Sequence, residues 1–298
     1  MYIRRYAVKH NRSKFEDIWP INKSVIDKKL DNALWPEGKD FAFILRHDVE
    51  TERGVERCRS LAEIDMNHGF KASFNFVPHR YETDSLLRQH LIEIGFEIGV
   101  HGLTHDGKLY SSKKIFKDRA IIINKFIEQW NAFGFYSPAA HHNLDWLHDL
   151  NIEYDSSTFD TDPFEPQPDP VNTIFPFVVM KHPDVPDSYV EIPYTLPQDF
   201  TIYILMEEKT NEIWKRKLDW IAENGGVAFL NTHPDYMYFH QGRKKITEYP
   251  VELYSEFLQY VSAKYKNRYW HVIPRELARF WSRYSDIEYG LHYTQFHD

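Results

Sequence analysis

Residues 96–107 read FEIGVHGLTHDG and place two histidines four positions apart, where a short apolar run gives way to glycines. The run FEIGV (96–100) has the length and residue types of a buried β-strand. His101 follows it directly, and His105 lies one loop turn later. Polar groups at strand ends are where α/β enzymes assemble their sites. The position of this pair, more than its spacing, makes it a candidate site.

Strand-like and helix-like segments alternate on both sides of this stretch. Strands are expected at 41–46, 71–77, 96–100, 152–157, 227–231 and 268–272. Helices are expected at about 52–67, 85–94, 112–133, 208–223, 252–265 and 274–283. Repeated β-α units of this kind favour a parallel sheet, either open or closed into a barrel. The fold class is therefore α/β.

Length and composition allow one sizeable core. The chain has 298 residues, of which 42% are hydrophobic and 16% aromatic. We expect a single catalytic domain over 1–298, with residues 1–40 packed on it as an N-terminal extension. Nine of the 16 prolines fall between Pro163 and Pro197, among several aromatic residues. Because flexible linkers contain few aromatic residues, we interpret 160–200 as an ordered excursion, with a plain surface loop as the alternative.

Charge and cysteine content exclude several classes of protein. The net charge of −8 argues against a nucleic-acid-binding surface. No apolar run reaches the length of about 18 residues that spans a membrane, and the N-terminus has no secretory signal, so a cytoplasmic protein is expected. Cys58 is the only cysteine, so any metal site must use His, Asp and Glu. The sequence leaves the oligomeric state open.

Polar residues end three of the expected strands, and in a parallel sheet these ends share one rim. Asp48 ends the first strand, His101 and His105 follow another, and His233 follows VAFLN. Asp48, His101 and His105 would give a divalent ion one carboxylate and two imidazole ligands, with positions open for water and substrate. Zinc suits such mixed ligands best, and nickel, cobalt or iron would also fit. A metal of this kind serves hydrolysis of an unreactive amide.

These segments resemble, in order, the motifs of the polysaccharide deacetylase family, the NodB homology domain. The second of two acidic residues in the first motif corresponds to Asp48, and the His-x-x-x-His motif corresponds to His101 and His105. The matching stretches are LRHDVE (45–50), EIGVHGLTH (97–105), FYSP (135–138), YDSS (154–157) and LNTH (230–233). Five ordered matches over about 190 residues are far more specific than any single one.

The resemblance implies a distorted (β/α) barrel and a metal-dependent hydrolase. The implied reaction removes an acyl group, most often N-acetyl, from an amino sugar or a sugar precursor. Two positions depart from the family pattern. His47 stands where the family has the Asp that acts as general base, and Tyr136 stands where it has the Arg that orients this Asp. We therefore expect His47 to take the proton of water, with Tyr136 within a few ångströms of it.

The remaining roles follow from position. His233 is expected to give a proton to the leaving nitrogen. Arg46, Tyr136 and Asp155 are expected to orient site residues or bind substrate, and Asp155 is a candidate to accept the ring hydrogen of His233. The expected partner is a small acylated sugar or related amide. Two alternatives stay open: a metal- and glycan-binding protein that has lost catalysis, and an amidohydrolase of the same fold that acts on a non-sugar amide.

Overall fold

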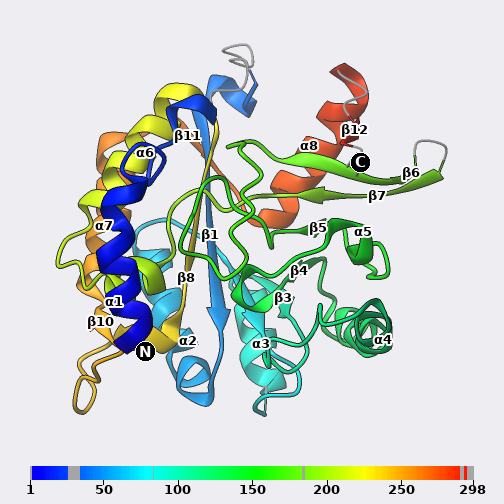
Figure 1. Ribbon diagram of the computed structural model, residues 1–298, viewed down its shortest axis with the longest axis horizontal. Coiled ribbons are helices and arrows are strands. Elements are labelled where there is room, and N and C mark those ends of the chain that lie inside the picture. The colour runs from blue at the N-terminus through cyan, green and yellow to red at the C-terminus, as the bar shows by residue number, and fades with distance from the viewer. Residues whose placement is uncertain (1, 26–33, 83, 183–184, 289–291, 294–298) are drawn as a thin grey trace.

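The centre of the molecule is a curled, mostly parallel sheet (Figure 1). The computed structural model describes residues 2–25, 34–82, 84–182, 185–288 and 292–293. The strands of this sheet are β1 (Phe41–Val49), β2 (Ser73–Phe76), β3 (Glu97–His101), β4 (Gly134–Tyr136), β5 (Tyr154–Asp155), β6 (Phe177–His182), β7 (Val185–Glu191), β8 (Val227–Thr232), β11 (Tyr269–His271) and β12 (His292–Tyr293). A small second sheet pairs β9 (Met237–Tyr238) with β10 (Tyr249–Pro250).

The strand order makes the sheet curl into a distorted (β/α) barrel, as the family resemblance implies. From β1 the sheet runs through β2, β3, β4 and β5 to β7 with parallel pairing throughout, and β8 pairs with β1 on its other edge. Beyond β7 the chain meets β8 at a parallel bridge between Leu196 and Leu230. Within the described ranges the parallel pattern is broken where β6 pairs antiparallel with β7, and β12 pairs parallel with β6 beyond it.

Helices cover the outer side of the sheet, in the alternation that the hydrophobic periodicity predicts. The helices are α1 (Tyr2–Asn11), α2 (Glu52–Asn67), α3 (Ser85–Glu93), α4 (Lys113–Trp130), α5 (Leu144–Leu147), α6 (Glu212–Asn224), α7 (Glu252–Lys264) and α8 (Pro274–Glu288). Ser112 and Asp84 cap α4 and α3 through their side chains, which accept hydrogen bonds from backbone N–H groups of the first turn. No helix in the described part of the chain is long and apolar enough to cross a membrane.

Strand β1 is buried on both faces, and each face packs into a different apolar cluster. Phe41, Phe43 and Leu45 point outward into the core between sheet and helices. Ala42 and Ile44 belong to a second apolar cluster inside the barrel. Because successive side chains of a strand point to opposite faces, the polar end of β1 is divided in the same way. Arg46 and Asp48 continue the inward row, and His47 continues the outward one.

The N-terminal helix α1 packs against a π-helical segment at Phe200–Leu205. Arg5 forms an ion pair with Glu207 at 3.0 Å, and its second nitrogen donates to the carbonyl of Ile246 at 2.9 Å. π-helical turns frequently occur at functional sites. This one begins directly after Asp199, a residue of the candidate site described below.

Candidate active site

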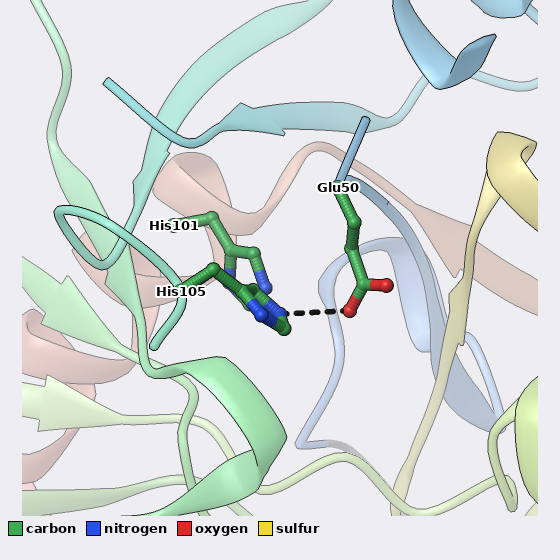
Figure 2. Close-up of side chains that lie close together, drawn as sticks. All are labelled: Glu50, His101 and His105. Atoms are coloured by element: carbon green, nitrogen blue, oxygen red, sulfur yellow. Dashed lines mark ion pairs between the residues drawn. The ribbon is translucent and has the colours of Figure 1, made fainter. Parts of the chain in front are cut away.

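Three side chains converge at the carboxyl ends of β1 and β3 (Figure 2). One ligand atom from each of Glu50, His101 and His105 lies within 4.8 Å of the other two. Nε2 of His105 is 2.8 Å from Oε1 of Glu50. This approach lacks hydrogen-bond geometry, and Nε2 of His101 and Nε2 of His105 are both buried without a hydrogen-bond partner. One carboxylate and two imidazoles with free nitrogens fit a divalent metal ion of the zinc type.

His101 is held in the state that a metal ligand requires. Its Nδ1 is 3.0 Å from the carbonyl oxygen of Tyr136 on the neighbouring strand, so the ring donates its Nδ1 hydrogen there. Nε2 is therefore left with a free lone pair that faces Glu50 and His105. Burial is the main cause that lowers the pKa of His101, to about 4. The imidazole is neutral at physiological pH.

The loop after β3 brings His105 back over His101. His105 has a φ of 54°, in the left-handed region that non-glycine residues rarely adopt. The loop is pinned by Arg119, whose two terminal nitrogens each donate to Asp106 at 2.7 Å. Gly102 is required here, because a Cβ at this position would lie 2.6 Å from the ring of Pro138.

Glu50 is positioned by the loop that follows β8. The hydroxyl of Tyr236 donates to Oε2 of Glu50 at 2.7 Å, which leaves Oε1 facing the histidines. The backbone N–H of Glu50 donates to Asp235 at 2.8 Å. Burial opposes ionisation, but His105, His233 and His101 outweigh it and hold the pKa of Glu50 below its usual range. The carboxylate is charged at any physiological pH.

Asp48 lies in the same cleft but has other partners. Its Oδ1 accepts from Asn75 at 2.9 Å, and its Oδ2 accepts from Asn231 at 2.9 Å. A guanidinium nitrogen of Arg46 is 3.2 Å from Oδ2. Burial works against the charged form, but Arg46 and two nearby histidines outweigh it and lower the pKa of Asp48. Asp48 is thus a buried, ionised carboxylate beside the metal-type cluster.

His233 forms a dyad with Asp199. Nδ1 of His233 is 2.7 Å from Oδ1 of Asp199, and its backbone N–H donates to Oδ2 at 2.9 Å. Burial disfavours the imidazolium, yet the Asp199 carboxylate and the acidic residues across the cleft raise the pKa of His233 to about 10. The other ring nitrogen lies 3.9 Å from Glu50 Oε1. His233 therefore presents a proton to the cleft.

These groups line one open cleft. It contains Asp48, His101, His105 and His233, the four residues that the sequence analysis expected on one rim. The other lining residues are Arg4, Arg46, Glu50, Ser137, Ala139, Ala140, Glu165, Pro166, Gln198, Phe200, Asn231 and Tyr236. The cleft combines a metal-type cluster, a charged carboxylate and a protonated imidazole, which is the equipment for metal-assisted hydrolysis.

Comparison with known proteins supports the fold. No family model and no curated protein sequence matches the chain. A solved structure from Mycobacterium smegmatis, assigned by its name to the polysaccharide deacetylases, has a TM-score of 0.64 and 17% identity and covers 89% of this chain and 96% of that one. The chain has the polysaccharide deacetylase fold.

Two further structures share this fold. A Pseudomonas aeruginosa protein, also named for the polysaccharide deacetylases, has a TM-score of 0.60 and 14% identity and covers 87% of this chain and 96% of that one. The allantoinase PuuE has a TM-score of 0.60 and 13% identity and covers 85% and 94%. Because a shared fold does not fix an activity, the function of this chain has to follow from the residues of its cleft.

The structure does not bring His47, the expected base, to this cleft. His47 is fully buried on the outward face of β1, where it packs on Phe74. Its Nδ1 is 2.8 Å from the hydroxyl of Thr232, and its Nε2 is 2.8 Å from Asp65. Both ring nitrogens are thus engaged between sheet and helix α2. The alternation of side chains along β1 separates His47 from Asp48.

The expected pairing of Tyr136 with His47 is replaced by other contacts. The Tyr136 hydroxyl donates to the hydroxyl of Tyr154 at 2.7 Å, inside the barrel. Its ring face receives the Arg46 guanidinium, with Cζ 4.4 Å from the ring centroid. Arg46 also donates to the carbonyl of Ser156 at 2.7 Å. Tyr136 and Ser156 therefore hold the arginine that contacts Asp48.

Asp155 lies below the cleft. Its carboxylate accepts from the backbone N–H and the hydroxyl of Ser157, both at 2.8 Å. Ser157 in turn accepts from the backbone N–H of Ser137, which begins the loop that forms one wall of the cleft. The partner of His233 is Asp199, and Asp155 is linked to the wall of the cleft through Ser157 and Ser137.

Among the residues of the site that the sequence did not reveal are Glu50 and Asp199 and the role of the Tyr236 hydroxyl. For Glu50 the signal was present, because Arg46, Asp48 and Glu50 stand at alternate positions and share one face of an extended chain. Asp199 comes from a non-strand segment 34 residues before His233. Nothing in its local sequence marks it.

The floor of the barrel contains a buried carboxyl group, Glu97, at the start of β3. The hydroxyl of Tyr154 donates to its Oε1 at 2.8 Å, and the backbone N–H of Arg275 donates to its Oε2 at 3.1 Å. Burial is the largest cause of its shift and raises the pKa of Glu97 from 4.5 to about 7. The folded state therefore binds a proton here that the unfolded chain releases at a lower pH.

We expect Glu97→Gln to change how stability depends on pH. The contribution of Glu97 is fully present below pH 4.5 and is lost as pH rises through 7. The variant should thus gain roughly 3 kcal/mol relative to the wild type between pH 4.5 and pH 8. Urea unfolding of both proteins at several pH values measures this difference. A difference that stays constant with pH would show that Glu97 titrates normally.

Proposed function

We propose that the protein is a metal-dependent hydrolase that removes an acyl group, N-acetyl in the first place, from an amino sugar or sugar precursor. The observation that carries the proposal is the cluster of Glu50, His101 and His105, in which two buried imidazole nitrogens have no hydrogen-bond partner. Buried polar atoms without partners are costly, and a bound cation would satisfy both at once.

Glu50, His101 and His105 are the proposed ligands, with zinc as the first candidate and nickel, cobalt or iron as the others. A divalent ion held there would polarise the substrate carbonyl and lower the pKa of a water molecule. Glu50 takes the ligand place expected of Asp48, because Glu50 and not Asp48 has an oxygen that faces both histidines. Oδ1 and Oδ2 of Asp48 already accept hydrogen bonds from two asparagines.

Asp48 is the proposed base, in place of His47. It is ionised, it lines the cleft, and Arg46 stabilises its charge from 3.2 Å. Asp48 accepts the proton that the attacking water loses, and His233 donates its Nε2 proton to the leaving nitrogen. Asp199 keeps the His233 ring oriented and protonated until the amide breaks. The pair of Asp48 and Arg46 supports an active enzyme over a binding protein that has lost its base.

The substrate class is proposed from the walls of the cleft. Phe200 and Tyr236 lie with their ring centroids 5.1 Å apart and offer an aromatic surface on which a sugar ring can stack. The likeness to polysaccharide deacetylases favours an acetylated sugar. The likeness to the allantoinase PuuE favours, as a second candidate, a non-sugar amide.

A substrate screen of the purified protein distinguishes a sugar deacetylase, a hydrolase of non-sugar amides and a binding protein without activity. Acetylated amino sugars, allantoin and simple amides are incubated with protein that has been stripped of metal and then supplied with zinc or cobalt. The proposal predicts metal-dependent release of acetate from at least one acetylated sugar. Turnover of allantoin or simple amides alone would move the assignment to the second candidate. A protein with full metal that is inert on the whole panel would be a binding protein.

A further inference from the structure

Helix α1 contributes a cation to the wall of the cleft. Arg4 is exposed, and it is the only residue of α1 among those that line the cleft. One of its nitrogens donates to the carbonyl of Phe164 at 3.2 Å, and its guanidinium carbon lies 5.4 Å from the ring centroid of Phe200. Figure 1 shows the N-terminal end of α1 at the same end of the molecule as the arrowhead of β1, where the site lies.

Three other basic side chains of this N-terminal segment have acidic partners. Arg5 and Lys9 both form ion pairs with Glu207, and Arg12 forms one with Glu208. Within the described ranges, no carboxylate is recorded at ion-pair distance from Arg4. These ion pairs fix α1 to the segment after Phe200–Leu205, so Arg4 is held over the cleft, where its charge acts on the Glu165 carboxyl group without forming an ion pair within the described ranges.

An aromatic row connects Arg4 with the catalytic residues. The ring centroids of His233 and Tyr236 are 5.1 Å apart, and those of Tyr236 and Phe200 are also 5.1 Å apart. Arg4 lies over Phe200 at the far end of this row. A substrate with its amide beside His233 would extend along the row and reach Arg4 with a part that is remote from the breaking bond.

The other charged groups of the cleft are already engaged. Arg46 contacts Asp48 and the carbonyl of Ser156. Glu50 belongs to the metal-type cluster. Glu165, the acidic residue on the Arg4 side, accepts hydrogen bonds at Oε1 from Tyr194 at 2.6 Å and Gln198 at 2.7 Å. Of the two arginines that line the cleft, Arg4 is therefore the one available to a ligand.

We propose that Arg4 binds an anionic group of the substrate, a carboxylate or a phosphate, remote from the amide that is hydrolysed. This inference rests on the proposed function, and it narrows the substrate to an acidic acylated sugar or related amide. A guanidinium is suited to both anions, because its planar fork matches their oxygen atoms. The aromatic row would carry the ring between the two ends.

The test measures binding to the metal-free protein by titration calorimetry, so that hydrolysis does not enter. The probes are neutral N-acetylglucosamine, its 6-phosphate, and N-acetylmuramic acid as the carboxylate. We expect the wild type to bind at least one anionic probe about 10- to 100-fold more tightly than the neutral sugar. Arg4→Gln should remove this preference, and which anionic probe is preferred distinguishes phosphate from carboxylate.

Lys14→Gln is the matched control, since it removes one positive charge from the same N-terminal segment outside the cleft and breaks none of these ion pairs. It should keep the preference. Equal binding of all three probes by the wild type, no binding of either anionic probe at millimolar concentration, or an unchanged preference in Arg4→Gln would each overturn the proposal. If one of these results overturned the role of Arg4 while the protein still hydrolysed a neutral substrate in the presence of metal, the proposed function would stand. If the wild type keeps its preference for an anionic probe but hydrolyses nothing, the role of Arg4 would stand and the proposed function would fall.

Discussion

Asp48→Asn should lower the rate of hydrolysis about 10²- to 10⁴-fold and leave the metal content unchanged. The amide keeps the size of the carboxylate and can still accept from one asparagine, but it cannot take a proton from water. Arg46 would then lose the charge that it stabilises from 3.2 Å. Steady-state kinetics with zinc-loaded protein, together with metal analysis of the same sample, measures both effects.

His47→Gln is the control for this experiment, because His47 and Asp48 are sequence neighbours on opposite faces of β1. His47 is fully buried and has both ring nitrogens engaged, with Thr232 and Asp65. Its replacement should lower stability while the folded fraction keeps its rate constant. The opposite pattern, with the rate lost in His47→Gln and kept in Asp48→Asn, would restore His47 as the base.

The second large effect concerns the metal. His101→Ala should lower zinc affinity more than about 100-fold, since even a residue that only supports a ligand commonly contributes 10- to 100-fold. Glu50→Gln should also lower it, because a neutral amide is a weaker ligand than a carboxylate. Competition with a chromogenic chelator measures these affinities.

His68→Ala is the control for loss of an imidazole elsewhere, since His68 lies after α2 and bonds Ser255 outside the cleft. It should bind zinc as the wild type does. The assignment of Glu50 would be lost if Glu50→Gln kept full affinity while Asp48→Asn lost it, because that result would return the ligand role to Asp48.

The sequence predicts the fold well because its signals are local and repeated. Buried strands such as 41–46 and 96–100 alternate with amphipathic helices, and the motifs follow one another in the order of the deacetylase family. His101, His105 and His233 could be found because each follows such a strand. A strand end in a parallel sheet fixes which rim a residue reaches, although the residues are far apart in sequence.

The direction of individual side chains on β1 was harder to predict from motif matching. Aligning His47 with a catalytic position ignores the alternation that turns it toward the helices, while the same alternation unites Arg46, Asp48 and Glu50. In the family pattern an arginine at the position of Tyr136 lies beside the catalytic carboxylate. Here Arg46 from β1 lies beside Asp48 instead, and the Tyr136 ring packs against its guanidinium. A contact of this kind depends on tertiary packing and has no local sequence signal.

The roles of Asp199 and Arg4 could not be predicted from the residues next to them in the sequence. Asp199 reaches His233 from the start of a π-helical turn, and Arg4 reaches the cleft from helix α1, 37 residues before β1 begins at Phe41. Both positions depend on how distant segments pack over the barrel. Such residues emerge only when the whole chain is folded.

Anomalous diffraction from crystals soaked in cobalt or zinc would show whether Glu50, His101 and His105 hold the catalytic metal. We expect one strong peak about 2.0–2.2 Å from Oε1 of Glu50 and from Nε2 of both histidines. A peak bound through Asp48 with Glu50 turned away, or no peak between the two histidines at saturating metal, would contradict this assignment.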